Sequence, residues 1–227
     1  MPRTDLYRNV HMGQRARMFA LAVELGAADL DRAGAAAAYA GRCLALTSEL
    51  REHADHEDAF IHPLLRERAP AAADALDAEH LRLDAAFVAL DAGARALPGT
   101  PADGLPEARH RLYLSLNEVI AAYLAHLHAE ETVAMPALWE HATEDELEAV
   151  FAAFRASRTP AESLADLRAM LPALPAPTRA AIVRGAVAAT PGEEHRTLAA
   201  VTTTLAPAQR DRLYADLGLP EVWALHG

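Results

Sequence analysis

Two segments of this sequence repeat a spacing of His, Glu and Pro that suits the binding of a metal ion. Residues 53–68 read HADHEDAFIHPLLRER, and residues 126–141 read HLHAEETVAMPALWEH. Each segment has a His, a Glu four residues later and a Pro six residues after that Glu. These residues are His53, Glu57 and Pro63 in the first segment and His126, Glu130 and Pro136 in the second. Residues four apart share a helix face, so each His–Glu pair offers ligands for a divalent metal such as iron, manganese or zinc.

The repetition itself has a physical reason if two metals are bound side by side. Helical bundles build dinuclear sites from His and Glu on facing helices, and two metals can share one bridging carboxylate from each helix. Two further histidines, each the only one of its helical segment, would complete such a site at the same depth of the bundle. The predicted dinuclear ligand set is His11, His53, Glu57, His80, His126 and Glu130.

Four long helical segments are predicted to carry these residues. Ala, Leu, Arg and Glu dominate the sequence, and these residues favour helices. The expected segments are residues 5–25, 31–68 with Asp31 as N-cap, 70–97 and 107–141. The Pro- and Gly-rich stretch LPGTPADGLP separates the last two, and Pro63 and Pro136 are expected to end or bend their helices. The sequence therefore predicts an all-α fold, with an up-down-up-down four-helix bundle in residues 1–142.

Residues 143–227 are predicted to form a C-terminal helical extension. The stretch TEDELEAVFAAFRAS opens with Thr143 as N-cap and Glu146 at the capping-box position. Pieces punctuated by Pro follow, which predicts about four shorter helices. No motif in this extension indicates chemistry, so a lid, a substrate pocket and a homodimer surface stay open as its role.

The composition argues against several classes of partner. The chain has 21 basic residues, all Arg, against 32 acidic ones, for a net charge of −11. That charge disfavours nonspecific nucleic-acid binding and polybasic membrane contacts. Cys43 is the only cysteine, which precludes an intrachain disulfide. No apolar run of about 18 residues is present, and the N-terminus carries charges where a signal peptide needs an apolar stretch. A cytoplasmic protein is expected.

The metal-binding residues resemble those of the hemerythrin-like family, which carries the HHE cation-binding domain. The similarity rests on His11, HADHE at 53–57, His80 and HLHAEE at 126–131, with IHPLL and AMPAL following the two pairs. It covers roughly residues 1–142. The resemblance implies two iron ions, with His11 and His53 as terminal ligands of one and His80 and His126 of the other. Glu57 and Glu130 would bridge them.

The sequence departs from the oxygen carriers of that family in two places. Those proteins have His-x-x-x-His in the third helix, whereas Asp84 here follows His80. Their last helix places the carboxylate five residues after the His, whereas Glu130 stands at four and Glu131 at five. On a helix Glu130 lies about 40° from His126 and Glu131 about 140°, which favours Glu130. Asp84 and Glu131 stay open as additional ligands.

The pattern H…HxxxE…H…HxxxE is similar to a subgroup with bacterial stress-related members and an iron-sensing eukaryotic relative. It implies a non-heme diiron protein that reacts with oxygen, hydrogen peroxide or nitric oxide in a redox or oxidative-stress response or in oxidant detoxification. Catalase- or peroxidase-like turnover, or an oxygenase acting on an organic substrate, would make it an enzyme. The main alternative is an iron or oxygen sensor whose C-terminal helices report the metal state. A storage bundle or a structural zinc site is least favoured, because such zinc sites are usually rich in Cys.

Several other side chains have two interpretations each. Tyr7 and Tyr123 are either core residues with a polar tip or hydrogen-bond donors to a bound oxygen species. Glu52, Asp58 and Glu131 are either acceptors behind the ligands or an ordinary solvated acidic face. His62 and His128 lie on the helix faces opposite their ligand pairs, and both are expected to be exposed to solvent.

Overall fold

The structure, a computed structural model, describes residues 3–219 and consists there of helices joined by turns and short loops, without a strand. The predicted all-α fold is confirmed. The end of the predicted C-terminal extension, residues 220–227, lies outside the described residues. The chain divides into two compact units. One holds α2 to α6 with most of α1 and α7, and the other holds α8 to α11 with Asn9–Gly13 of α1 and the last residues of α7. The predicted boundary after residue 142 stays a prediction.

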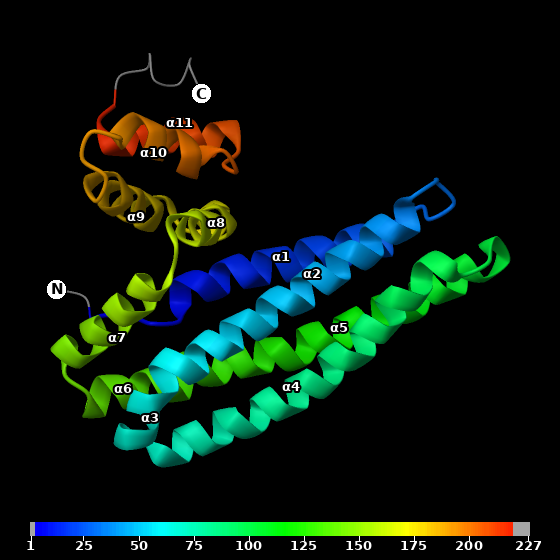
Figure 1. The fold of residues 1–227 in the computed structure, drawn as a ribbon, viewed down its shortest axis with the longest axis horizontal. Helices are drawn as coiled ribbons and strands as arrows, with labels where there is room; N and C mark the ends of the chain where they lie inside the picture. Colours follow the sequence, from blue (N-terminus) through cyan, green and yellow to red (C-terminus); the bar gives the residue numbers. More distant parts are fainter. Residues whose placement is uncertain (1–2, 220–227) are drawn as a thin grey trace. The chain divides into compact units, whose positions relative to one another are not determined.

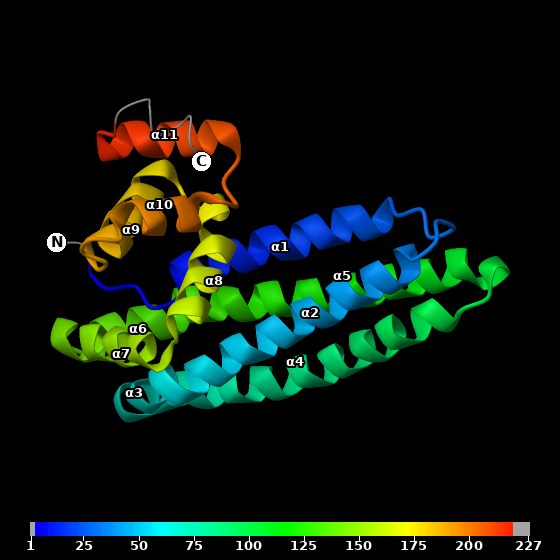
Figure 2. The same cartoon turned by 45° about the horizontal axis from the view of Figure 1, so that its top comes forward.

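Four long helical stretches make up the first unit. They are α1 (Arg8–Gly26); α2 (Ala35–His56) with η1 (Glu57–Ile61) and α3 (His62–Arg68); α4 (Pro70–Ala96); and α5 (Leu105–Ala129) with η4 (Glu130–Ala134) and α6 (Met135–His141). The 3₁₀ turns η2 (Leu97–Gly99) and η3 (Ala102–Gly104) join α4 to α5. The stretches lie side by side, and successive ones run in opposite directions (Figures 1 and 2). The sequence predicted all four.

The start of α2 differs from the prediction. The helix begins at Ala35, and its N-cap is Gly34 rather than Asp31. Gly34 has a φ of 79°, in the left-handed region that glycine adopts without a steric penalty. The turn after α1 therefore extends further than the N-cap preference of Asp suggested.

Two clusters of buried apolar side chains fill the bundle. The larger one joins α1, α2, α4 and α5, and includes Met18, Leu25, Leu50, Leu90, Leu116 and Leu127. The smaller one lies around α3 and α6, and includes Tyr7, Ile61, Leu65, Met135 and Leu138. Most of the predicted metal ligands lie between the two clusters along their helices, and His126 lies next to Leu127 at the edge of the larger one. The apolar side chains thus hold the helices in place on both sides of one polar layer.

A buried carboxylate links α2 to α4 within the larger cluster. Asp91 is only 5% exposed. It accepts hydrogen bonds from the Thr47 hydroxyl at 2.5 Å and the Arg51 guanidinium at 3.0 Å. Arg95 lies 3.5 Å away on the same helix as Asp91. These partners offset the cost of burying the charge.

The helix α7 (Glu144–Ser157) starts with the predicted capping box. The Thr143 hydroxyl accepts a hydrogen bond from the Glu146 backbone N–H, and the Glu146 carboxylate accepts from the Thr143 N–H at 2.8 Å. That backbone hydrogen bond and the contact with Arg68 lower the pKa of Glu146 to about 2. Leu147, one residue further, is fully buried in the smaller apolar cluster, so the cap anchors α7 on the bundle.

The second unit has a core of its own. Its elements are α8 (Pro160–Met170), η5 (Leu171–Ala173), α9 (Ala176–Ala188), α10 (Glu194–Thr202) and α11 (Pro207–Leu217). The core includes Leu171, Val183, Leu198, Val201 and Leu213. Arg179 is buried and donates to the backbone oxygens of Leu171 and Leu174, which closes the turn between α8 and α9. The expected C-terminal set of shorter helices is therefore present.

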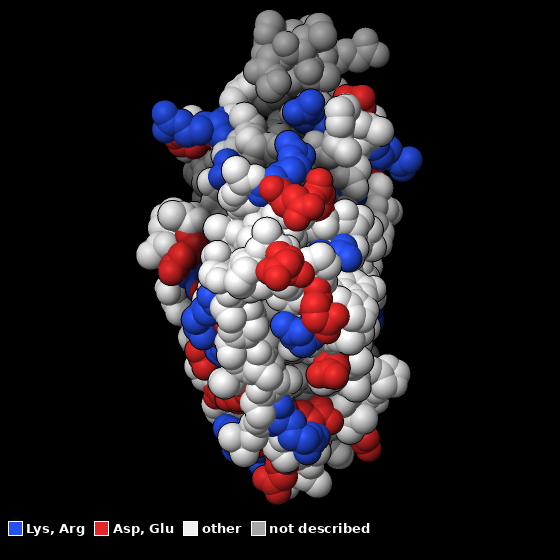
Figure 3. Space-filling model, turned by 90° about the vertical axis from the view of Figure 1, so that its right-hand side faces the viewer, with Lys and Arg blue, Asp and Glu red and all other residues white. Residues whose placement is uncertain are grey.

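The surface carries charges of both signs. On the face shown in Figure 3, acidic and basic side chains are interspersed among uncharged ones. Within residues 3–219, every helix is too short or too polar to cross a membrane.

Replacing Asp91 by Ala is expected to destabilise the protein by about 2–3 kcal/mol, because Thr47 and Arg51 lose a charged partner that they contact inside the bundle. Urea unfolding of the variant measures this change. Asp84→Ala is the matched control, since Asp84 lies 4.0 Å from the same Arg51 but is 62% exposed. Its loss should cost less than about 0.5 kcal/mol. Equal losses in the two variants would contradict the role given to Asp91.

Candidate metal centre

Each repeated segment places its carboxylate at the first residue of a π-helical turn. The turns are η1 and η4, and each ends two residues before the repeated Pro. Pro has no backbone N–H, and its ring clashes with the carbonyl four residues earlier. The helix accommodates this by a backbone hydrogen bond that spans five residues instead of four. The bonded pairs are His62 N–H to Glu57 O and Met135 N–H to Glu130 O. The expected end or bend at each Pro is thus a π turn.

The π turn changes which residues face the bundle interior. It contains one residue more than an α-helical turn, so the residues after it are displaced by about 100° around the axis. His62 follows η1 and is fully buried, and its ring stacks on that of His80 with centroids 5.3 Å apart. The prediction that His62 is exposed was therefore wrong. His128 precedes η4 and is exposed, as predicted.

Four of the predicted ligands come together at one position. These are Glu57, His80, His126 and Glu130, whose ligand atoms all lie within 4.8 Å of one another. The Nε2 atoms of His80 and His126 are 3.1 Å apart. His126 Nε2 lies 3.2 Å from Glu130 Oε1, and His80 Nε2 lies 3.7 Å from Glu57 Oε2. Both carboxylates are at most 1% exposed.

The other two predicted ligands join Glu57 in a second group. His11, His53 and Glu57 have ligand atoms within 4.8 Å of one another. His53 Nε2 lies 2.8 Å from Glu57 Oε1. The two carboxylate oxygens of Glu57 therefore face different histidines, and all six predicted residues belong to two groups that share this side chain.

The spacing of these atoms fits a divalent metal. Two ligands at right angles around a metal with bonds of about 2.1 Å lie about 3 Å apart. The observed distances of 2.8, 3.1 and 3.2 Å are close to that value. The facing Nε2 atoms of His80 and His126 can form a hydrogen bond only if one ring carries the proton on Nε2 and the other accepts it through its lone pair. A cation between them would instead engage both lone pairs and also offset the buried carboxylate charges.

Two carboxylates contact the outer nitrogens of the histidines. Glu79 Oε2 lies 3.0 Å from His126 Nδ1, and Asp58 Oδ1 lies 3.4 Å from His80 Nδ1. Asp58 was one of the acids that the sequence left open for such a role, whereas Glu79 was not among them. The available signal was that Glu79 precedes His80 directly, so that its side chain points about 100° away, toward a neighbouring helix.

Asp58 also belongs to a smaller cluster behind His80. His62 Nδ1 lies 2.8 Å from Asp58 Oδ1 and 3.2 Å from Asp77 Oδ1. Arg66 donates to both oxygens of Asp77 at 3.0 Å. The charge of Asp77 is therefore compensated by Arg66, and the cluster holds the ring of His62 against that of His80.

The two additional ligands left open by the sequence lie outside both groups. The Glu131 carboxylate accepts a hydrogen bond from Arg15 at 2.7 Å. Asp84 is largely exposed and lies 4.0 Å from Arg51. Glu130 rather than Glu131 is the carboxylate that lies beside His126.

The buried carboxylates change the acid–base properties of their neighbours. Burial lowers the pKa of His126, but the hydrogen bond and charge of Glu130 outweigh it and, with Glu57 and Glu79, raise this pKa to about 9. His80 follows the same pattern: burial lowers its pKa, and the hydrogen bond with Glu57 raises it above its usual value. Without a metal, both rings therefore hold a proton more strongly than a solvated imidazole.

Two buried phenols lie beside this layer. Burial and the nearby charges of Glu57 and Glu130 raise the pKa of Tyr7 and of Tyr123 well above its usual value. The Tyr123 ring centroid is 5.8 Å from that of His126. Both hydroxyls therefore stay protonated, and each has a proton that it can donate.

A hollow of about 260 Å³ reaches the ligands from the side of α2 and α4. His80 and Tyr123 form part of its lining, together with apolar walls that include Leu83 and Phe87. Arg51, Asp55, Asp58 and Asp84 also line it. Of the six predicted ligands, His80 is the one that lines this hollow.

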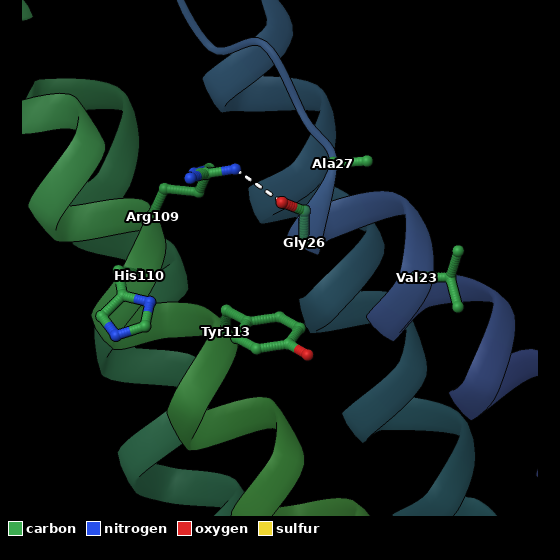
Figure 4. A pocket seen from close by; sticks show the side chains of 6 residues that line it. All are labelled: Val23, Gly26, Ala27, Arg109, His110 and Tyr113. Carbon is green, nitrogen blue, oxygen red and sulfur yellow. Dashed lines mark hydrogen bonds between the residues drawn. The ribbon is translucent and has the colours of Figure 1, made fainter.

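A second hollow, of about 420 Å³, lies near the C-terminus of α1 (Figure 4). Arg109 crosses from α5 and donates to the Gly26 backbone oxygen at 2.6 Å. This contact satisfies a carbonyl at the helix end. Its lining has a single His, His110, so we assign it no chemistry.

Comparison with known proteins gives one family. The family model described as Hemerythrin HHE cation binding domain matches residues 3–138. No curated protein and no solved structure matches the chain. The matched stretch contains all six residues of the two ligand groups.

The raised pKa of His126 predicts how the metal-free protein responds to pH. The unfolded chain has a His pKa of about 6.5. The stabilisation is fully present below that pH and is lost as the pH rises through about 9. We expect the free energy of unfolding, measured with urea in the presence of a chelator, to fall by up to about 3 kcal/mol between pH 6.5 and 9.5.

The His126→Gln variant should lose most of this pH dependence. The matched control is His128→Gln, which changes an exposed histidine on the same helix. It should keep the wild-type dependence. Identical pH profiles for wild type and His126→Gln would contradict the assignment.

Proposed function

Since this chain belongs to the hemerythrin HHE cation binding domain family, we propose that its long helices hold two iron ions. His11 and His53 would be the terminal ligands of one iron, and His80 and His126 those of the other. Glu57 and Glu130 would bridge them. The observation that carries this proposal is that Glu57 belongs to both ligand groups, with one oxygen toward His53 and the other toward His80.

The proposed function is reaction with a small oxidant: oxygen, hydrogen peroxide or nitric oxide. When bound, the irons supply the electrons that reduce such a molecule. The hollow beside His80 has a volume of about 260 Å³, which admits molecules of this size. We place the protein in a redox or oxidative-stress response or in oxidant detoxification, and catalase- or peroxidase-like turnover is the enzymatic form of this proposal.

The side chains around the ligands support that chemistry. Tyr7 and Tyr123 carry protonated hydroxyls that can donate hydrogen bonds to an oxygen species as negative charge develops on it. Leu83 and Phe87 give the hollow an apolar wall beside His80. Tyr123 lines the same hollow, so one of the two phenols lies beside the space that an oxidant would enter.

A second candidate function is that of an iron or oxygen sensor. The C-terminal helices have a hydrophobic core of their own, which suits a separate module that reports the metal state. Those helices are also the proposed surface for a homodimer. Nucleic acid and membranes are not among the proposed partners, given the net charge of −11.

Rapid mixing of the iron-loaded, reduced protein with oxygen, hydrogen peroxide or nitric oxide tests the first candidate. We expect an optical change with at least one of them. Glu57→Ala should slow it about 100-fold or abolish it, because both ligand groups lose their shared carboxylate. Glu52→Gln is the control, since Glu52 is a half-exposed acid on the same helix outside both groups. No reaction with any of the three, in protein shown to contain iron, would refute oxidant chemistry.

Limited proteolysis tests the sensor. If the C-terminal helices report the metal state, cleavage between residues 158 and 206 should change several-fold between the metal-free and iron-loaded forms. Unchanged cleavage together with rapid peroxide consumption would exclude the sensor. A large change without peroxide consumption would favour it over the detoxifying protein.

A further inference from the structure

In three pairs of neighbouring residues, one residue is a proposed ligand and the other is an acidic residue outside the ligand set. The pairs are Glu57–Asp58 in η1, Glu79–His80 in α4 and Glu130–Glu131 in η4. Side chains of consecutive helical residues point about 100° apart. One member of each pair can therefore face the bundle interior while the other reaches toward an adjacent helix.

In each pair, the acidic residue that is not a proposed ligand contacts a long helix other than its own. Asp58 of η1 reaches His80 of α4, and Glu79 of α4 reaches His126 of α5. Glu131 of η4 reaches Arg15 of α1 at 2.7 Å. Two of these contacts end on the outer nitrogen of a proposed ligand. Asp58 and Glu79 thus each contact a proposed ligand on a neighbouring helix, and Glu131 contacts α1 through Arg15.

The contact between Glu79 and His126 is the shorter of the two that end on an imidazole. A neutral imidazole carries its proton on one nitrogen and a lone pair on the other. A carboxylate that accepts from Nδ1–H at 3.0 Å fixes the proton there. Nε2 is then left with its lone pair, and this atom faces His80 Nε2 and Glu130 Oε1. Glu79 therefore favours the form of His126 that binds a metal through Nε2.

Glu79 also lies near Arg82, but this contact does not explain why the Glu79 carboxylate lies beside His126. Arg82 lies 3.7 Å away on the same helix and is 70% exposed. Such an exposed pair contributes little to stability. His126, in contrast, is almost fully buried, and its Nδ1 has Glu79 as a direct acceptor.

His80 is held in a related way. Asp58 Oδ1 lies 3.4 Å from its Nδ1, and the ring of His62 stacks on its own ring with an interplanar angle of 11°. Asp58 Oδ1 lies closer to His62 Nδ1, at 2.8 Å, so this carboxylate acts on His80 mainly by holding the His62 ring. The stacking then favours one ring plane for His80.

We propose that Glu79 is a positioning residue of the metal centre, which holds His126 with its proton on Nδ1 and its Nε2 toward the metal, and that His62, held by Asp58 and Asp77, fixes the ring plane of His80 by stacking on it. This inference rests on the iron site proposed above. Outer carboxylates of this kind orient a ligating histidine and raise its basicity. Glu79 does not bind the metal itself and lies outside both ligand groups.

The test measures the affinity of the full-length chain for Fe(II) under anaerobic conditions, by competition with a chelator, in three variants. Glu79→Ala should bind about 10- to 100-fold more weakly than wild type, as expected for the loss of such a partner. Glu79→Gln retains an oxygen that can accept from Nδ1–H, and it should recover part of the loss. Arg82→Gln removes the other partner of Glu79 and should bind as wild type does.

Two further measurements separate positioning from a structural role. The metal-free variants should melt close to the wild-type temperature, and the iron-loaded Glu79→Ala protein should show shifted charge-transfer bands. Wild-type affinity and spectrum in Glu79→Ala would overturn the proposal for Glu79 and leave the iron site intact. Equal losses in Glu79→Gln and Arg82→Gln would overturn it as well. Failure of the wild-type chain to bind Fe(II) would instead refute the iron site itself.

Discussion

Two carboxylates inside an apolar helical bundle are the constraint on which the rest of this structure depends. Glu57 and Glu130 are 1% and 0% exposed, and a buried charge without compensation costs several kcal/mol. Histidines from the long helices stand beside them, and a divalent metal is the compensation that their spacing fits. Apolar clusters on both sides of this layer exclude water and fix the helices. The bundle is stable around the layer only if the charges are balanced within it.

The repeated Pro belongs to the same arrangement. Pro63 and Pro136 cannot donate a backbone hydrogen bond, and each helix responds with a π turn whose first residue is the proposed bridging carboxylate. The repeated segment is therefore one unit that combines a His–Glu pair with a local distortion of the helix. Such single π turns occur frequently at functional sites. Here the turn also rotates His62 into the interior, where it supports His80.

Much of the fold and of the candidate site could be predicted from the sequence. Ala and Leu content, together with Pro and Gly at the breaks, indicated the long helices, and Thr143 with Glu146 indicated the start of α7. The two His–Glu pairs could be proposed because residues four apart share a helix face, and His11 and His80 because each is the only histidine of its helical segment. The burial of His62 escaped prediction, because a regular helical wheel contains no π turn. Glu79 was missed because its position before His80 indicates only that its side chain points away from that ligand. Its contact with His126 depends on how α4 is rotated against α5.

The metal content of the protein tests the central claim most directly. Elemental analysis is needed on protein purified without added metal and without affinity-tag histidines, from cells grown with sufficient iron. A dinuclear site built from both ligand groups predicts about two irons per chain. Zinc in place of iron, or one metal or none per chain, would contradict the account, because the groups that share Glu57 would then not bind iron as a pair.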